Sequence, residues 1–273
     1  MTNSQNIMQK TDWKTIGLLG VMYVLFLGNF GLYFCARLPL VLHVLIGIAA
    51  IHCSFTIWHE AIHGTVSENA AVNDAAGILG MFPYMLTPYY TGKWIHLMHH
   101  KNLNLPEDPN TLYTDGPFRT LYQRYPRAAT ALKRIIKNRE FPAHEVLADR
   151  IFRIGVAGVF LALIFTGNFA ALFWLWLVPL GFAKIIMDWY INYIPHVGLP
   201  ADRYKGTRIL DIAWLTPLVF FHNYHAIHHL WPTRPWHTYK SIFDEKRTML
   251  KEHGVPIETS LAGLSYDPQF QAV

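Results

Sequence analysis

The sequence has few cysteines and few charges, and each shortage excludes a class of protein. Of 273 residues only 2 are cysteine, Cys35 and Cys53, and both lie in apolar stretches. Two cysteines form no disulfide framework and fall short of the four ligands that an iron–sulfur cluster takes. Charged residues make up 15% of the chain, whereas about 25% is usual in soluble domains. The composition therefore points away from disulfide-rich secreted domains and from ordinary soluble enzymes.

The apolar residues are concentrated in long uncharged runs, at 16–36, 39–58 and 154–182. About 20 such residues suffice to cross the hydrocarbon core of a bilayer. The last run is too long for one crossing, and the sequence Thr-Gly-Asn at 166–168 predicts a turn inside it. We therefore expect an all-α integral membrane protein with four transmembrane helices. These helices are predicted over residues 15–36, 39–58, 151–166 and 169–190.

The distribution of positive charge predicts how the chain sits in the membrane. The two predicted hairpin turns hold a single positive charge, Arg37, whereas the other Lys and Arg residues fall at the opposite helix ends or in polar segments. Because Lys and Arg favour the cytoplasmic side, we expect both termini in the cytoplasm, together with a His-rich cap of residues 59–150 and 191–273. Residues 1–273 then form one multi-pass membrane domain. On this interpretation the net charge of +5 reflects topology and not binding of nucleic acid.

Grouped histidines provide the strongest functional signal. The pattern His-x-x-His-His occurs twice, at 96–100 and 225–229, and a His-x-x-x-His group precedes both at 59–63. Residues three or four apart share one face of a helix. Imidazole suits iron, zinc and copper, and so many imidazoles exceed the needs of one ion. We therefore expect a two-metal site that carries the chemistry without a separate catalytic residue. The candidate ligands are His59, His63, His96, His99, His100, His225, His228 and His229.

The end of the fourth predicted helix adds two candidates, Asn192 and His196, one helical turn apart. Their spacing is equally compatible with metal ligands and with a polar helix end at the interface. A further set of residues is placed to lie behind the ligands and hydrogen-bond to them, and it comprises Asp188, Glu60, Asp108 and His222.

Three aromatic residues follow the last histidine group, namely Trp231, Trp236 and Tyr239. They either wall a channel for a lipid-like substrate or anchor a helix at the membrane interface, as aromatic belts do.

A different class of enzyme remains open at this point. Residues 59–63 read His-Glu-Ala-Ile-His, which fits the HExxH motif of zinc proteases with Glu60 as general base. An intramembrane zinc metalloprotease is therefore an alternative, although one catalytic zinc takes three protein ligands and a water and leaves most of the histidines unexplained. A ferritin-like carboxylate di-iron site requires two Glu-x-x-His motifs, and only the one at 60–63 is present.

The order of the three histidine groups resembles the signature of the membrane fatty acid desaturase-like superfamily, H-x(3,4)-H, H-x-x-H-H and H/Q-x-x-H-H, over roughly residues 50–240. The resemblance implies two non-haem iron ions, O₂ as co-substrate and the eight histidines as ligands. It also implies that Asn192 and His196 complete the ligand set. Electrons must then come from a donor such as a ferredoxin or a cytochrome, because the chain has no haem-attachment motif, flavin fingerprint or cluster cysteines.

The sequence around the histidines is similar to carotenoid-ring oxygenases. Residues 59–64 (HEAIHG) and the Asp-Pro pair at 108–109 after His99-His100 resemble motifs of carotenoid ketolases and hydroxylases. Residues 223–232 (NYHAIHHLWP), followed by Pro235-Trp236, resemble most the bacterial and cyanobacterial type of β-carotene hydroxylase. The implied activity is O₂-dependent hydroxylation of an unactivated C–H bond in a carotenoid ring. A carotenoid ketolase and an acyl-lipid desaturase of the same fold remain alternatives. Asn110 stands where many members have a second Asp.

A basic segment at residues 119–139 has two interpretations. Complementary charge would steer an acidic electron carrier towards it, and anionic lipid headgroups would be attracted equally well.

Overall fold

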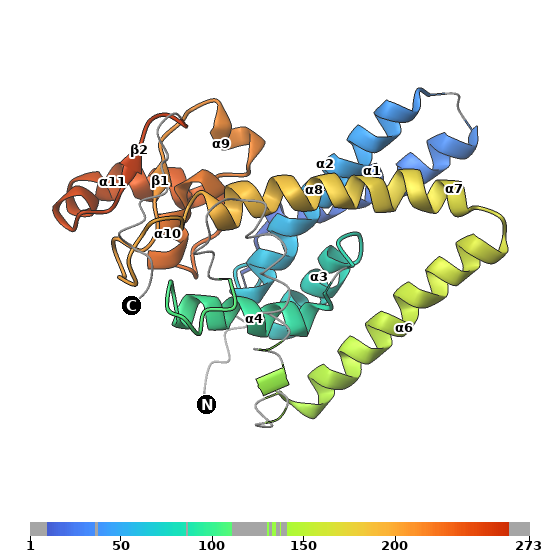
Figure 1. The fold of residues 1–273 in the computed structure, drawn as a ribbon, viewed down its shortest axis with the longest axis horizontal. Helices are drawn as coiled ribbons and strands as arrows, with labels where there is room; N and C mark the ends of the chain where they lie inside the picture. Colours follow the sequence, from blue (N-terminus) through green and yellow to red (C-terminus); the bar gives the residue numbers. More distant parts are fainter. Residues whose placement is uncertain are drawn as a thin grey trace, which may run out of the picture.

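The computed structural model describes residues 10–35, 38–85, 87–110 and 141–261, together with the single positions 130, 133, 134 and 137. The predicted turn residue Arg37 and nearly all of the basic segment 119–139 lie outside the described residues. Figure 1 shows two long helical hairpins that extend to one side of the molecule, and a group of shorter elements on the opposite side. The described part of the chain is thus divided into a hairpin side and a cap side.

The first hairpin consists of α1, Trp13–Cys35, and α2, Leu40–Ile62, which have 23 residues each. At 1.5 Å per residue such a helix is about 34 Å long, enough for a hydrocarbon core of about 30 Å. The first half of α2 exposes several aliphatic side chains, whereas every residue from Cys53 to Ile62 is buried. The end of α2 that carries the first histidines therefore lies in the protein interior.

A composite helix forms one arm of the second hairpin. It runs through α7, Phe169–Leu172, a π-helical segment η1, Phe173–Leu177, α8, Val178–Met187, and a second π-helical segment η2, Asp188–Tyr193. In η2 the N–H of Ile194 donates to the carbonyl oxygen of Trp189 at 2.9 Å. Such i→i+5 segments are rare and occur often at functional sites. Here the second one carries Asn192 and leads directly to His196.

Three described helices are long and apolar enough to cross a membrane, at Trp13–Cys35, Leu40–Ile62 and Phe169–Tyr193. They confirm three of the four predicted transmembrane helices by length and composition. The fourth prediction, 151–166, falls in α6, Ala143–Phe165, whose first half contains charged residues. The uncharged part of α6, residues 154–165, is only about 18 Å long at 1.5 Å per residue. The predicted fourth crossing is therefore not confirmed and stays a prediction.

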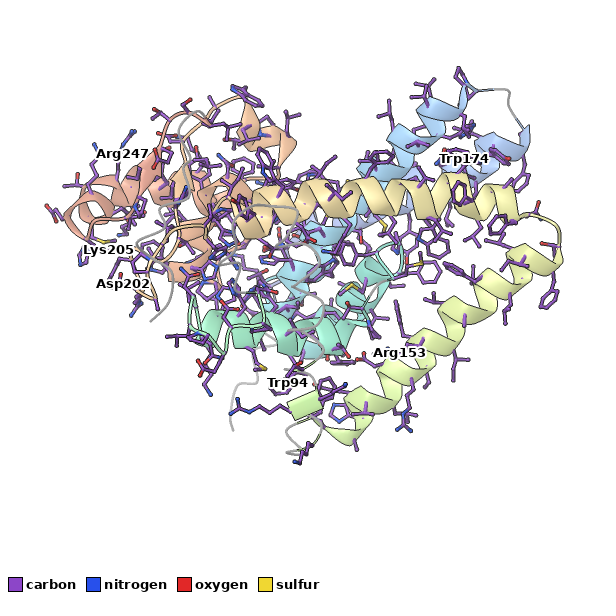
Figure 2. All side chains as sticks on the ribbon, viewed as in Figure 1. Trp94, Arg153, Trp174, Asp202, Lys205 and Arg247 are labelled. Carbon is purple, nitrogen blue, oxygen red and sulfur yellow. The ribbon has the colours of Figure 1, made fainter. Side chains whose placement is uncertain are left out.

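The hairpin side and the cap side carry different labelled side chains in Figure 2, and Arg153 marks the charged first half of α6 on the hairpin side. Trp174 lies in the hairpin side, whereas Asp202, Lys205 and Arg247 lie in the cap side. The hairpin helices expose aliphatic and aromatic side chains such as Phe165, which is 84% exposed. Exposed apolar surface of this extent is typical of a lipid-facing region.

Two shorter helices lie beside α2, namely α3, Ala70–Met81, and α4, Tyr89–Lys101. The residue before α4 is Pro88, whose side chain makes no capping hydrogen bond. Instead, the carboxylate of Asp149 in α6 accepts the N–H groups of Tyr90 and Thr91 at 3.1 and 2.8 Å. A carboxylate at a helix N-terminus satisfies orphan N–H groups and opposes the positive end of the helix dipole. Thus α6 holds α4, the helix that carries His96, His99 and His100.

The cap side is completed by short elements around a small apolar core that includes Tyr224, Ile227 and Phe243. The parallel strands β1, Ile209–Leu210, and β2, Ile257–Glu258, pair with each other. The helical elements in this part are α9, Leu215–Leu218, η3, His222–Tyr224, α10, His225–Leu230, η4, Trp236–Thr238, and α11, Tyr239–Glu252. This core supports α10, which carries the last histidine group, from the side opposite to α2.

Candidate metal centre

The fold brings together all the histidines that the sequence predicts as ligands. Among the described residues, two groups of four could hold a metal ion, and in each group one nitrogen per residue lies within 4.8 Å of the others. The first histidine group comprises His59, His63, His96 and His228, and the second histidine group comprises His99, His196, His225 and His229.

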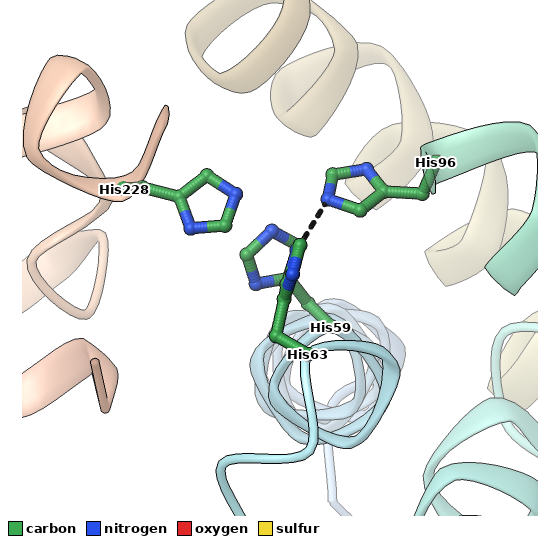
Figure 3. A group of neighbouring side chains, drawn as sticks. All are labelled: His59, His63, His96 and His228. Carbon is green, nitrogen blue, oxygen red and sulfur yellow. Dashed lines mark hydrogen bonds between the residues drawn. The ribbon is translucent and has the colours of Figure 1, made fainter. Parts of the chain in front are cut away.

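The first histidine group draws its rings from α2, α4 and α10, and Figure 3 shows the rings converging on a common space. The Nε2 atoms of His63 and His96 lie 2.9 Å apart. Two nitrogens bound at about 2.1 Å to one ion and about 90° apart are separated by about 3.0 Å. Neither ring nitrogen of buried His59 has a hydrogen-bond partner among the described residues. The spacing and the unpartnered nitrogens both fit a bound ion.

His100 lies between the two groups. Its Nε2 is 2.9 Å from that of His228 and 3.0 Å from that of His96. Its ring stacks on that of His229 with centroids 4.3 Å apart. His100 therefore adds a nitrogen to the first histidine group while contacting the second.

The second histidine group has a similar spacing. The Nε2 of His225 lies 2.9 Å from that of His196 and 3.0 Å from that of His229. The ring of His99 is 4.8 Å from that of His196 between centroids. The sequence alone left His196 equally balanced between a ligand and a polar helix end, and the structure places it among the histidines.

Burial and the neighbouring imidazoles determine the protonation of these groups. Burial lowers the pKa of His63 to about 3. Six other histidines have a pKa well below 6.5, because they are buried and lie next to further imidazoles. These are His96, His100, His196, His225, His228 and His229. Neutral imidazole is the form that binds a metal. An all-nitrogen donor set of this kind suits iron, copper or zinc, so the residues present fit the two-metal site that the sequence predicts.

Asp108 supports the second histidine group from behind. Its carboxylate accepts a hydrogen bond from Nδ1 of His99 at 2.8 Å. The same carboxylate accepts the N–H groups of Asn104 at 3.1 Å and Asn110 at 2.8 Å. Since Nδ1 of His99 carries the hydrogen, its Nε2 has the free lone pair that a ligand needs.

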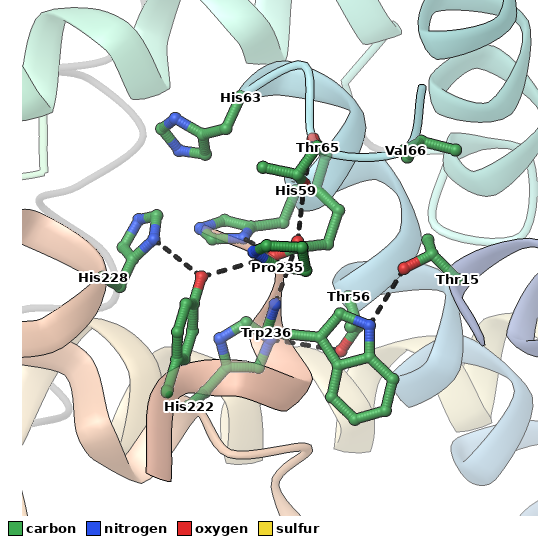
Figure 4. A network of polar contacts seen from close by, with 12 residues as sticks. Thr15, Thr56, His59, His63, Thr65, Val66, His222, His228, Pro235 and Trp236 are labelled. Carbon is green, nitrogen blue, oxygen red and sulfur yellow. Dashed lines mark hydrogen bonds and ion pairs between the residues drawn. The ribbon is translucent and has the colours of Figure 1, made fainter. Parts of the chain in front are cut away.

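Glu60 is held away from the metal-facing nitrogens. Its Oε2 accepts from the hydroxyl of Thr65 at 2.6 Å and from the backbone N–H of Trp236 at 3.1 Å. Its Oε1 accepts from the hydroxyl of Tyr239 at 3.4 Å. Figure 4 shows this network beside His59 and His228. Oε1 is engaged by α11, and Oε2 by η4 and the loop after α2, which disfavours the role of Glu60 as the general base of a zinc protease.

Comparison with known proteins identifies the family. The sequence profile described as fatty acid desaturase matches residues 36–260. The chain belongs to the fatty acid desaturase family. No curated protein matches the chain. The family implies an oxidoreductase that acts on lipids in a membrane context, and its members are known for di-iron sites. Together with the three apolar helices, membership indicates a membrane protein.

In this member of the desaturase family, Lys184, Asp188 and Asn192 are linked by polar contacts beside the second histidine group. The ammonium of Lys184 and the carboxylate of Asp188 form an ion pair one turn apart. The other carboxylate oxygen of Asp188 accepts from the side-chain amide of Asn192 at 3.1 Å. Because the amide nitrogen is held there, the carbonyl oxygen of Asn192 is the atom left to face a ligand.

His222 lies next to the first histidine group without joining it. Its ring centroid is 5.1 Å from that of His59, and its Nε2 lies 3.2 Å from the hydroxyl of Thr56. Burial lowers the pKa of His222 to about 3. It packs against His59 and Thr56 of α2 and against Tyr239 of α11, so its predicted place beside the ligands stays a prediction, and its Nε2 faces a threonine rather than a ligand histidine.

A cavity of about 90 Å³ opens onto both histidine groups. Among its lining residues are His96, His99, His225 and Asn192. Its apolar wall comes from α2, α4, the segment around α3 and the composite helix, and consists of Phe55, Trp58, Met81, Tyr84, Ile95 and Ile191. The sequence did not predict these apolar lining residues. Helical periodicity could have identified Phe55, which lies one turn before His59 on the same face.

The three aromatic residues after the last histidine group do not line this cavity. The indole N–H of Trp236 donates to the hydroxyl of Thr15 at 3.0 Å. Trp231 lies on a different surface pocket of about 700 Å³, whose lining also includes Lys10, Asp12 and Glu68. The hydroxyl of Tyr239 lies 3.0 Å from Nδ1 of His228. The apolar residues of the cavity, and not these three, therefore lie next to the histidines on the open side of the site.

Proposed function

We propose that this member of the desaturase family is a membrane di-iron oxygenase that hydroxylates an unactivated C–H bond in a carotenoid ring, with O₂ and external electrons. The observation that carries the proposal is the pair of adjacent histidine groups, each with nitrogens within 4.8 Å of one another. The carotenoid ring is supported by the flanking sequences at 59–64, 108–109 and 223–232.

The two irons would be held by separate sets of residues. His59, His63, His96, His100 and His228 would hold one iron, and His99, His196, His225 and His229 the other, with Asn192 beside it. When bound, the irons supply the activation of O₂ that no side chain of this chain provides. Because burial and the adjacent imidazoles lower the pKa of His96 and His229 well below 6.5, these two rings would bind a metal without first losing a proton.

The protein's own contribution is to orient the substrate and exclude water. The apolar wall, with Phe55 and Trp58 on α2, would direct an apolar chain towards the histidines. The cavity of about 90 Å³ is far smaller than the roughly 300–1,000 Å³ typical of a pocket that encloses a whole ligand. It would therefore admit only the end of an elongated lipid, with the remainder of the molecule in the bilayer.

Acyl-lipid desaturation is the second candidate, because the matching family profile is that of fatty acid desaturases. Both reactions begin with loss of a hydrogen from an unactivated carbon, and small differences in substrate placement decide the product. A carotenoid ketolase of the same fold belongs with the first candidate, since it acts on the same ring. In every case an external donor such as a ferredoxin or a cytochrome supplies the electrons.

Expression in a β-carotene-producing bacterium tests the proposal. Chromatography of the pigments should show new, more polar hydroxylated products with the wild-type chain. His228→Ala should reduce them below detection, because it removes a ligand. His253→Ala is the matched control, since His253 is exposed, lies outside both histidine groups and contacts the Met249 carbonyl and the ring of Tyr204; it should leave the pigments as in the wild type.

Two results would contradict the proposal in different ways. Unchanged pigments together with altered fatty acids would identify an acyl-lipid desaturase. Hydroxylated pigment made by His228→Ala would show that the histidine groups are not the site of the chemistry.

A further inference from the structure

We propose that Tyr239, backed by Glu60, is a positioning residue that fixes the orientation and tautomer of His228 in the first histidine group. The inference rests on the proposed function only in taking a metal ion as the occupant of that group. Glu60, the acidic residue of the protease-like HExxH sequence, then has a different role. It belongs to a series of hydrogen bonds that ends on His228 in another helix.

The two ring nitrogens of His228 face different surroundings. Nε2 lies in the first histidine group and is 2.9 Å from Nε2 of His100. Nδ1 lies on the far side of the ring, 3.0 Å from the hydroxyl oxygen of Tyr239. A neutral imidazole that binds a metal through the lone pair of Nε2 must carry its hydrogen on Nδ1.

This requirement sets the direction of every hydrogen bond in the chain. The Nδ1–H of His228 donates to the oxygen of Tyr239, so the phenol hydrogen is free to donate onwards. The hydroxyl of Tyr239 then donates to Oε1 of Glu60 at 3.4 Å. Reversing the order would place a hydrogen on Nε2 of His228 and remove the lone pair from the metal side.

Burial makes the chain of contacts hard to replace. The exposed fractions are 0% for His228, 0% for Tyr239 and 1% for Glu60, so bulk water has no access to the hydroxyl. Glu60 is itself held by Thr65 and by the backbone N–H of Trp236. The network therefore joins the end of α2, the start of α11 and α10 at one buried point, directly beside two ligand helices.

Metal titration of the purified full chain tests this role. The protein is stripped of metal in detergent and titrated with Co²⁺, whose absorbance reports each nitrogen-bound ion. Tyr239→Phe removes one oxygen and keeps the ring. We expect it to weaken the affinity for one of the two ions by about 10–100-fold, as loss of such an outer hydrogen bond does, and to leave the other unchanged. Glu60→Gln should weaken the affinity for the same ion.

Tyr224→Phe is the matched control, since Tyr224 is equally buried in the same small core and its hydroxyl donates to Asp211 at 3.2 Å. It should alter neither affinity. The melting temperature of the metal-free protein is measured in parallel for both variants, because each loses one buried hydroxyl and the comparison separates an effect on metal affinity from an effect on stability. Wild-type affinity for both ions in Tyr239→Phe would overturn the proposal. Equal weakening of both ions with a lower metal-free melting temperature would overturn it as well, by showing a structural role.

The same titration separates this inference from the proposed function. Wild-type protein that binds fewer than two ions contradicts the di-iron proposal itself. Two ions bound equally well by the wild type and Tyr239→Phe contradict only the role of Tyr239.

Discussion

Asp108 illustrates how one side chain can organise both a ligand and the loop that follows it. Its two oxygens accept from His99 and from two backbone N–H groups of the turn, and it is 1% exposed. The sequence predicted this role from a carboxylate in a proline-bounded turn eight residues after His100. The prediction was possible because the turn and the ligand are close in the chain.

Replacement of Asp108 by Asn tests the support of the second histidine group. The amide group turns one acceptor into a donor, so either His99 or a buried backbone N–H loses its partner. We expect about 10–100-fold weaker binding of one metal ion and a loss of about 1–3 kcal/mol in the free energy of unfolding. Metal titration and thermal unfolding of the purified protein measure the two effects. Asp244→Asn, at an exposed pair with Lys240, should change neither, and equal metal affinities in Asp108→Asn and the wild type would contradict the assignment.

The partnership of Tyr239 with Glu60 could not be predicted in the same way. The two residues are 179 positions apart, and the sequence gives no local sign that α11 begins beside the end of α2. The motif at 59–63 instead suggested a protease base. Only the three-dimensional arrangement shows that both oxygens of Glu60 are engaged by α11, η4 and the loop after α2.

At the scale of helices, the predicted boundaries lie close to those observed, but the second helix extends further than predicted at the end that carries His59. The first two helices were predicted at 15–36 and 39–58, and they are found at Trp13–Cys35 and Leu40–Ile62. The second continues past its predicted end to Ile62, so that His59 lies inside the helix and His63 is its C-terminal cap residue. The π-helical segments were not predicted, since an i→i+5 pattern leaves no distinct periodicity in the sequence. They matter because the second segment precedes His196.

Close packing of α2 against the composite helix depends on Gly47. A Cβ atom at this position would lie 2.6 Å from Cγ of Pro179 and 3.0 Å from the carbonyl oxygen of Leu175. Small residues of this kind allow membrane helices to approach each other. The contact holds the helix of Asn192 at a fixed distance from the helix of His59.

Gly47→Ala should therefore destabilise the protein by about 1–3 kcal/mol, the usual cost of an overpacked contact. Thermal unfolding in detergent measures the change. Gly28→Ala in α1 is the matched control, because a Cβ there has nothing within 4 Å, and it should be neutral or stabilising by up to about 1 kcal/mol through helix propensity. A melting temperature of Gly47→Ala at or above that of the control would contradict this account of the helix packing.

At the scale of the whole molecule, the sequence correctly predicted that distant histidine groups meet at one side of a helical membrane protein. The helices α4 and α10 both lie away from the hairpin ends in Figure 1, and their His100 and His228 rings meet. The fourth crossing was predicted from an uncharged run, and the structure shows that the charged first half of its helix is used to hold α4 through Asp149. The cytoplasmic orientation of the histidines follows from charge distribution alone and stays a prediction.

Most of the apolar lining of the cavity could not be predicted from the sequence for a similar reason, with the exception of Phe55, which lies one helical turn before His59. Trp231, Trp236 and Tyr239 follow the last histidine group in the chain, which suggested a channel there. The cavity is instead lined by residues such as Phe55 and Tyr84 from other parts of the chain. Which apolar residues meet at a cavity depends on how the helices cross, and local periodicity does not encode that crossing.

Anomalous X-ray scattering at the iron edge, from crystals of the protein purified with its native metal, tests the central claim most directly. The account predicts two iron peaks, one inside the first histidine group and one inside the second. A single zinc peak beside His59 and His63, with no metal among His99, His196, His225 and His229, would contradict it.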